Sequence, residues 1–331
     1  MDTTCLSIFF LLLAPVIPLA NGQPLVPALF TFGDSVLDVG INNHLKTLIK
    51  ANFLPYGRDF TTHKPTGRFC NGKLASDFTA EYLGFTSYPQ AYLGGGGKDF
   101  LVGASFASAA SGYLDTTAEL YNALSFTQQL EYYKEYQNKV AEVAGKPNAS
   151  SIISGAIYLV SAGSNDFLQN YYINPLLYKK YTNLYALGAR RIGVTTLPPL
   201  GCLPAAITVF GSDSNECVEK LNNDAVAFNS KLNATSQSLR TKLSGLNLVV
   251  LDSYKPLYDL ITKPAEHGFS EARKACCGTG LLETSFLCNT ESVGTCANAS
   301  EYVFWDGFHP SEAANKFLAS SLLASGISLI S

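Results

Sequence analysis

The sequence predicts an α/β protein whose mostly parallel sheet is covered by helices on both faces. Short apolar runs, typical of buried strands, alternate along the chain with longer segments of helical periodicity. Hydrophobic residues make up 47% of the 331 residues and charged residues only 15%, so the chain can form a sizeable core. Beyond residue 22 there is no linker, repeat or low-complexity segment. We therefore expect one domain over residues 23–331.

The first half of this domain is predicted to contain two strands and two helices. An unbroken apolar run predicts a buried strand over residues 26–32. Apolar residues at helical spacing predict a helix over residues 74–83, with Gly84 at its C-terminal end. A shorter apolar run predicts a second strand over residues 101–106. An amphipathic pattern that begins with a serine N-cap predicts a helix over residues 125–144.

The second half continues the alternation. Apolar runs predict three further strands, over residues 156–160, 191–196 and 246–251. Helical spacing predicts helices over residues 176–187, 216–243, 254–261 and 311–323. Because each strand is separated from the next by a helical segment, the five expected strands should run parallel in one sheet.

The N-terminal residues predict export from the cell. Residues 6–13 are apolar, and Ala20-Asn21-Gly22 offers small residues for cleavage. This pattern is typical of a secretory signal peptide over residues 1–22. The apolar run is too short and too interrupted by proline to span a membrane. We expect residues 23–331 to be soluble and secreted, without an integral membrane segment.

Sequons and net charge are compatible with an extracellular protein. Asparagines in Asn-x-Ser/Thr sequons occur at Asn148, Asn233 and Asn298, which are therefore candidate glycosylation sites. The formal net charge of -3 argues against a nucleic-acid partner, since such proteins usually present a basic face.

The cysteine pattern predicts disulfides rather than a metal site. Seven cysteines remain after residue 22: Cys70, Cys202, Cys217, Cys276, Cys277, Cys288 and Cys296. In an oxidising compartment most of them should pair. We expect Cys202 to pair with Cys217, the last four to cross-link the segment before the C-terminus, and Cys70 to remain free. No Cys-x-x-Cys is present, so we expect no zinc or other metal site.

Polar or small residues follow three of the expected strands. Ser35 follows the first strand, a small-residue turn around Ala110 follows the second, and Asn165 follows the third. The carboxyl ends of parallel strands meet at one edge of a sheet, where α/β proteins bind their ligands. Backbone N–H groups and an amide there could stabilise an oxyanion. Taken singly, each feature is also explained as a helix cap, a tight turn or an Asx turn.

Asp306 and His309 lie three residues apart in an aromatic segment near the C-terminus. At this spacing the carboxylate can accept a hydrogen bond from Nδ1 of the ring, which leaves Nε2 as a base near neutral pH. In isolation, a pair that only caps the last helix is nearly as good an explanation. Together with Ser35, the two residues supply the parts of an activated hydroxyl nucleophile. The absence of Gly-x-Ser-x-Gly argues against the ordinary α/β-hydrolase fold.

Five motifs together resemble the plant GDSL esterase/lipase family of the SGNH hydrolase superfamily. They are Phe-Gly-Asp-Ser-x-x-Asp-x-Gly at 32–40, Lys-Pro-Thr-Gly-Arg-Phe at 64–69, Phe-Ala-Ser-Ala-Ala-Ser-Gly at 106–112, Gly-Ser-Asn-Asp at 163–166 and Phe-Trp-Asp-x-x-His-Pro at 304–310. The resemblance covers essentially the whole mature chain. It implies a flavodoxin-like three-layer α/β/α sandwich with a central, mostly parallel five-stranded sheet.

The resemblance also implies roles for single residues. Ser35 would be the nucleophile, His309 the base, and Asp306 the residue that orients the base. The oxyanion hole would use the backbone N–H groups of Ser35 and Ala110 and the side-chain amide of Asn165. The reaction would require no metal or cofactor.

The chain departs from the family pattern in three places. Ile41 stands where the family commonly has asparagine, and Ala110 where it usually has glycine, with Gly112 as an alternative alignment. Between Thr182 and Asn183 about one helix is missing relative to the family. We therefore expect the sheet to close but to pack imperfectly over the third and fourth strands.

These observations predict a secreted serine esterase or lipase that hydrolyses carboxylic esters through an acyl-enzyme on Ser35. Its substrate would be a small-molecule, lipid or cell-wall ester. Two alternatives stay open. The same site would act as an acyltransferase if an alcohol captured the acyl group. The apparent loss of a helix near Thr182 would instead fit a catalytically impaired secreted glycoprotein that acts by binding.

Overall fold

The computed structural model describes residues 23–171, 184–211 and 215–330. The predicted signal peptide, residues 1–22, lies outside the described residues. So does most of the helix predicted over residues 176–187, of which only the short 3₁₀ helix Leu184–Leu187 is described. Within the described ranges, no helix is long and apolar enough to cross a membrane.

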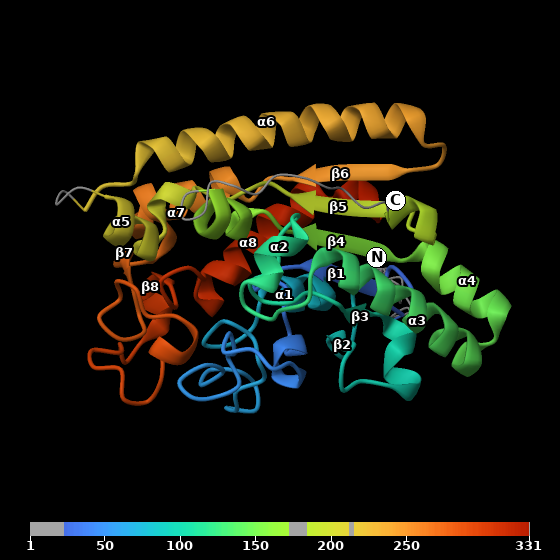
Figure 1. Cartoon of the computed structure of the whole chain (residues 1–331), viewed down its shortest axis with the longest axis horizontal. Coiled ribbons are helices and arrows are strands. Elements are labelled where there is room, and N and C mark those ends of the chain that lie inside the picture. The colour runs from blue at the N-terminus through green and yellow to red at the C-terminus, as the bar shows by residue number, and fades with distance from the viewer. Residues whose placement is uncertain (1–22, 172–183, 212–214, 331) are drawn as a thin grey trace, which may run out of the picture.

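A parallel sheet of six strands forms the centre of the fold (Figure 1). In spatial order its strands are β2 (Gln90–Ala91), β3 (Ala104–Ser105), β1 (Leu29–Gly33), β4 (Ile157–Ser161), β5 (Arg191–Thr195) and β6 (Asn247–Leu251). The expectation of five strands is therefore wrong. The missed strand, β2, has only two residues and lies at the edge of the sheet, so it leaves no apolar run in the sequence.

Helices cover both faces of the sheet, which confirms the three-layer α/β/α arrangement. Successive residues of a strand point to opposite faces. Phe30 of β1 therefore packs with α3 (Phe126–Ala144) and α4 (Lys146–Gly155). Leu29 packs on the other face, among residues of α1 (Ala75–Tyr82) and α8 (Glu312–Ser325).

The remaining helices connect or flank the strands. They are α2 (Asp115–Glu119), α5 (Pro204–Phe210), α6 (Glu219–Lys242) and α7 (Tyr254–Thr262). The sequence analysis missed α2, α4 and α5, which are short or have a proline in their first turn. It also missed a second, two-stranded parallel sheet of β7 (Glu271–Ala275) and β8 (Tyr302–Phe304).

The strand predicted over residues 101–106 is only partly correct. A 3₁₀ helix, Gly97–Val102, occupies its beginning, and the strand proper is the two-residue β3. Gly103 separates the two with a φ of 107°. A side chain at this position would collide with the backbone of Leu29 in β1, so glycine is needed for the chain to enter the sheet.

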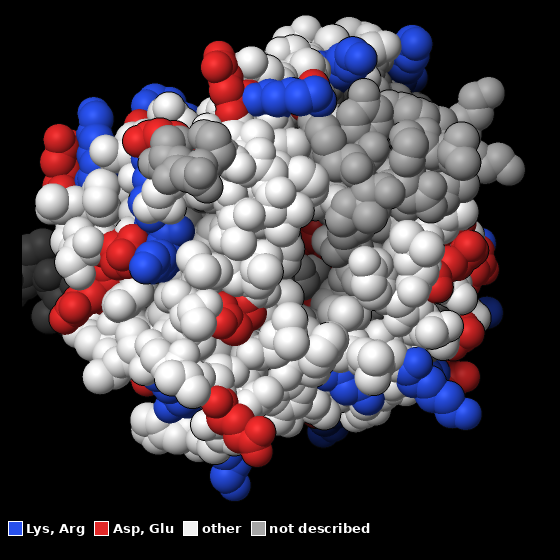
Figure 2. Space-filling view, turned by 60° about the vertical axis from the view of Figure 1, so that its left-hand side comes forward, with Lys and Arg blue, Asp and Glu red and all other residues white. Residues whose placement is uncertain are grey.

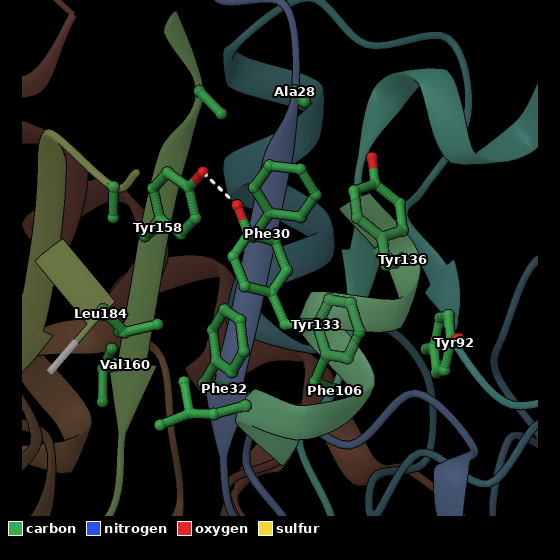
Figure 3. Packing of buried hydrophobic residues seen from close by; sticks show 14 of the residues in the cluster. Ala28, Phe30, Phe32, Tyr92, Phe106, Tyr133, Tyr136, Tyr158, Val160 and Leu184 are labelled. Carbon is green, nitrogen blue, oxygen red and sulfur yellow. Dashed lines mark hydrogen bonds between the residues drawn. The ribbon is translucent and has the colours of Figure 1, made fainter. Parts of the chain in front are cut away.

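Aromatic side chains fill the core between the sheet and α3 (Figure 3). The ring of Phe30 meets those of Tyr133 and Tyr136 edge-on, with centroids 5.4 Å and 5.2 Å apart. The hydroxyls of Tyr133 and Tyr158 lie 2.6 Å apart, which satisfies both inside the core. Edge-to-face ring pairs contribute about 0.5–1.5 kcal/mol each beyond area burial. This packing fixes β1, the strand that leads into Ser35.

The expected cysteine chemistry is confirmed within the described residues. Cys202 pairs with Cys217, Cys276 with Cys296, and Cys277 with Cys288. Cys70 is free and buried. The last two disulfides cross-link the long connection between β7 and β8.

The sheet closes across the region of the shortened crossover. β4 pairs with β5 in regular parallel register from Ile157 to Val160. This confirms that the shorter connection still allows the strands to meet. The predicted imperfect packing above these strands concerns residues 172–183, which lie outside the described part of the chain, and stays a prediction.

Candidate active site

Ser35, His309 and Asp306 form one line of hydrogen bonds beyond the carboxyl end of β1. Nε2 of His309 lies 2.7 Å from Oγ of Ser35, and Nδ1 lies 2.7 Å from Oδ1 of Asp306. The structure thus brings together two segments that are 274 residues apart in the chain. The ring is oriented as the Asp306–His309 spacing predicts, with Nε2 directed at the serine hydroxyl.

The turn that presents Ser35 depends on Gly33 and Gln129. Gly33 has a φ of 126°, and a side chain there would overlap the backbone of Ser161 in β4. The amide of Gln129, in α3, accepts a hydrogen bond from the Gly33 N–H at 2.8 Å and donates one to the Gly33 carbonyl at 2.8 Å. These contacts fix the end of β1 two residues before the serine. The sequence analysis assigned no role to Gln129.

Asp306 is fully buried and surrounded by donors. Besides the ring of His309, it accepts hydrogen bonds from the Tyr56 hydroxyl at 2.7 Å, the Thr284 hydroxyl at 3.1 Å and the Phe308 N–H at 3.0 Å. Burial, with Asp306 as a neighbour, raises the pKa of Tyr56 well above its ordinary value, so its hydroxyl remains a donor. These donors offset the burial of the carboxylate and hold it against the ring.

Ala110 and Asn165 line the same cavity as Ser35. Ala110 has a φ of 70°, a conformation that favours glycine and that agrees with the glycine the family usually has there. Among the described residues, the backbone N–H groups of Ser35 and Ala110 donate no hydrogen bond. The Asn165 amide donates to the Ser111 carbonyl at 2.7 Å, which holds it beside this loop. Three groups that could donate to an oxyanion therefore line one cavity.

Two carboxylates, the buried Asp38 and the partly buried Asp166, hold the Ala110 loop from either end. Asp38 accepts a hydrogen bond from the Ala109 N–H at 2.9 Å. Asp166 accepts from the Tyr113 N–H at 2.7 Å, beyond the loop. Both aspartates belong to the motifs noted above, but the sequence analysis assigned a positioning role to neither of them.

Ile41, the first departure from the family pattern, leaves this arrangement intact. Its backbone N–H donates to Asp38 at 2.7 Å, a contact that any side chain would allow. The Ile41 side chain is fully buried in the aromatic core. The substitution therefore changes core packing and not the hydrogen bonds of the motif.

Asp34, next to Ser35, is a further buried acid at this end of the sheet. Burial raises its pKa from 3.8 to about 7, partly offset by a hydrogen bond from the Val36 N–H. Between these two values the folded state binds more protons than the unfolded state. This carboxyl therefore makes the free energy of unfolding fall as the pH rises from about 4 to about 7.

Replacing Asp34 with asparagine should flatten this pH dependence. The expected change in slope is up to about 1.4 kcal/mol per pH unit, the value for one titrating proton. Asp38, whose pKa is raised to about 6 mainly by burial, titrates in both proteins, so its contribution cancels and the largest difference in slope lies between about pH 5 and about pH 6. Urea unfolding at both pH values measures it, with Asp259→Asn on α7 as a control for the lost charge. If the free energy of unfolding changed with pH at the same slope in Asp34→Asn and in wild type, the prediction would be contradicted.

A cavity of about 180 Å³ opens at Ser35 and His309. Its walls are largely apolar and include Val36, Leu37, Phe69, Leu203, Leu257 and Phe308. Figure 2 turns the carboxyl ends of the strands toward the viewer, and it shows a hollow where most of the described residues at the border are uncharged. A cavity with apolar walls and a few convergent polar groups suits a mainly apolar ligand.

Known proteins resemble this chain over nearly its whole length. It is 67% identical to the GDSL esterase/lipase At5g22810 of Arabidopsis thaliana over 338 positions, which cover 96% of this chain and 93% of the relative. Since 96% of 331 residues is about 318, about 20 positions of that alignment have no counterpart in this chain. This agrees with the missing helix that the sequence analysis inferred.

Two further relatives and a family model give the same assignment. The chain is 61% identical to the GDSL esterase/lipase At5g03820 (94% of each chain) and 58% identical to the GDSL esterase/lipase APG (92% of each), both of Arabidopsis thaliana. The family described as GDSL-like Lipase/Acylhydrolase matches residues 29–322, which include Ser35, Asp306 and His309. The chain belongs to this GDSL-like lipase/acylhydrolase family.

Proposed function

We propose that Ser35, His309 and Asp306 are the catalytic residues of this chain, and that Ser35, Ala110 and Asn165 provide its oxyanion hole. Family membership makes the chain a serine esterase or lipase, that is, a carboxylic ester hydrolase. The observation that supports the residue assignment best is the 2.7 Å contact between His309 Nε2 and Ser35 Oγ. A base within this distance can take the hydroxyl proton as attack begins.

The proposed reaction has two halves. Oγ of Ser35 attacks the ester carbonyl carbon while Nε2 of His309 takes the hydroxyl proton. The carbonyl oxygen becomes an oxyanion, which the N–H groups of the oxyanion hole stabilise. His309 then protonates the leaving alcohol, and the acyl group remains on Ser35. In the second half, His309 activates a water that attacks the acyl carbon, which releases the acid and restores Ser35.

We further propose that residues 23–331 form one secreted domain after removal of residues 1–22. Three disulfides fit an oxidising compartment. The sequon asparagines Asn148, Asn233 and Asn298 are all exposed, as glycosylation sites must be.

The substrate is an ester, and we propose a lipid or cell-wall ester as well as smaller ones. An acyltransferase would use the same residues, with an alcohol in place of the water; product analysis with added alcohol separates the two.

One observation favours the alternative of a catalytically impaired binding glycoprotein. About 20 positions of the first relative have no counterpart here, and the segment inferred to be shortened follows Asn165 in the chain. The hydrogen-bonded line of Ser35, His309 and Asp306 supports the esterase instead.

A fluorophosphonate probe tests the esterase directly, because it reacts only with an activated serine. We expect one probe per molecule by intact mass in the secreted protein, and none in Ser35→Ala. A thermal melt of both proteins checks that they are folded. A wild-type protein that melts cooperatively but takes up no probe would overturn the proposal and favour the binding glycoprotein.

A further inference from the structure

A second cavity lies beneath the sheet, next to the cavity at Ser35. The second cavity has a volume of about 50 Å³ and lies between the sheet and helices α1 and α8. Four residues line both cavities and mark their junction: Leu37, Ala75, Thr195 and Leu322. From these shared walls we infer that the two cavities form one channel, and that it holds the acyl chain of the substrate. The inference rests on the esterase function proposed above.

The chemistry of the channel walls fits a hydrocarbon chain. The described residues that line the second cavity include no charged side chain. Leu159 of β4 and Leu251 of β6 line it on the sheet side, and Leu322 and Leu329 on the side of the C-terminal segment. An alkyl chain buried here would lose its contact with water, and only one hydroxyl of the described lining, that of Ser76, is buried without a hydrogen-bond partner.

Helix α8 gives the scale of the channel. Leu318 lines the first cavity, Leu322 both, and Gly326 the second. Leu318 and Leu322 lie one turn apart on α8, Gly326 is the C-terminal cap of the helix, and the three span about 12 Å at 1.5 Å per residue. An extended chain of about ten tetrahedral carbons, with bonds of about 1.5 Å, covers this distance. The channel therefore fits acyl groups of medium length.

The order of the two half-reactions assigns the channel to the acyl chain. The alcohol leaves first, while the acyl group stays on Ser35 until water attacks. The second cavity runs beneath the sheet, away from the surface, and therefore suits the acyl group, which stays on the enzyme. The hollow on the surface (Figure 2) gives the alcohol and the water their path.

The first experiment measures kcat/KM for p-nitrophenyl esters of increasing acyl length. Each methylene that becomes buried raises kcat/KM by up to about fourfold. We expect an increase of at least about tenfold from butyrate to decanoate, followed by a decline for longer chains that exceed the channel. A parallel series of alkyl acetates varies the alcohol instead, and we expect no comparable increase there.

The second experiment narrows the junction with Ala75→Leu. Ala75 is the first residue of α1, and leucine has nearly the same helix propensity as alanine. We expect the decanoate-to-butyrate ratio of kcat/KM to fall at least about tenfold, because the longer chain loses its buried methylenes. Ala324→Leu makes the same change at an exposed position of α8 and should keep the wild-type ratio.

The outcomes separate this inference from the proposed function. Three results would overturn the acyl channel if the fluorophosphonate still labels Ser35. They are a kcat/KM that does not rise with acyl length, a decanoate-to-butyrate ratio that Ala75→Leu leaves unchanged, and a kcat/KM that rises with the length of the alcohol. Absence of both labelling and hydrolysis in a folded protein would overturn the esterase itself, and the channel with it.

Discussion

Replacing Asp306 with asparagine is expected to lower kcat about 10⁴-fold, as loss of the orienting carboxylate does in other serine hydrolases. The carboxylate holds Nδ1 of His309 as the donor, so that Nε2 can accept the Ser35 proton. An amide can present its own N–H to Nδ1 and thereby favour the tautomer with the proton on Nε2. That tautomer cannot act as the base.

Steady-state kinetics on a short-chain ester measure this effect, and a thermal melt confirms that the variant is folded. Tyr56→Phe is a milder variant of the same network, since it removes one hydrogen-bond donor to Asp306 and leaves the carboxylate in place. Its loss of activity should be much smaller. Asp259→Asn, at a partly exposed position on α7, is the control for a lost charge. A folded Asp306→Asn enzyme within about tenfold of wild type would contradict the orienting role.

Replacing Asp77 with alanine is expected to lower the free energy of unfolding by about 3–5 kcal/mol. Both side chains of the Arg68–Asp77 pair are buried, and two hydrogen bonds of 2.8 Å join them. Without Asp77, the guanidinium of Arg68 stays buried without its counter-charge. The change also removes the bond from Leu74 N–H to Asp77 that closes the first turn of α1.

Urea unfolding measures this loss, and two further variants define its cause. Glu131→Ala breaks an exposed ion pair with Lys134 and should cost less than about 1 kcal/mol. The double variant Arg68→Met/Asp77→Leu removes both charges and should recover much of the stability. A cost below about 1 kcal/mol for Asp77→Ala would show that the buried pair does not hold this region together.

The Arg68–Asp77 pair also affects the active site through the next residue. Phe69 follows Arg68, and its ring centroid lies 5.2 Å from that of His309. We therefore expect Asp77→Ala to lose activity at a lower temperature than wild type, in step with its unfolding.

Local patterns predicted the parts of the site that are local in sequence. Ser35 follows a long apolar run, and Asp306 and His309 lie three residues apart, so short-range rules marked both as candidates, and the resemblance to the family supplied their roles. The supporting side chains come from distant segments: Tyr56 reaches Asp306 across 250 residues, and Gln129 reaches Gly33 across 96. No periodicity or spacing encodes such contacts. Strands β2 and β8 were missed because they are too short for a pattern to form, and β7 because its five residues, Glu-Ala-Arg-Lys-Ala, make no apolar run.

The disulfides between β7 and β8 have a consequence for when this protein can work. Thr284, which donates to Asp306, and Ser285, whose N–H donates to the Tyr56 hydroxyl, both lie in the loop closed by Cys277 and Cys288. The loop that supports the base is thus itself held by a bond that forms only where thiols are oxidised. A newly made chain in a reducing compartment lacks this support. For the secreted protein proposed above, the active site would therefore mature only after this disulfide has formed in an oxidising compartment.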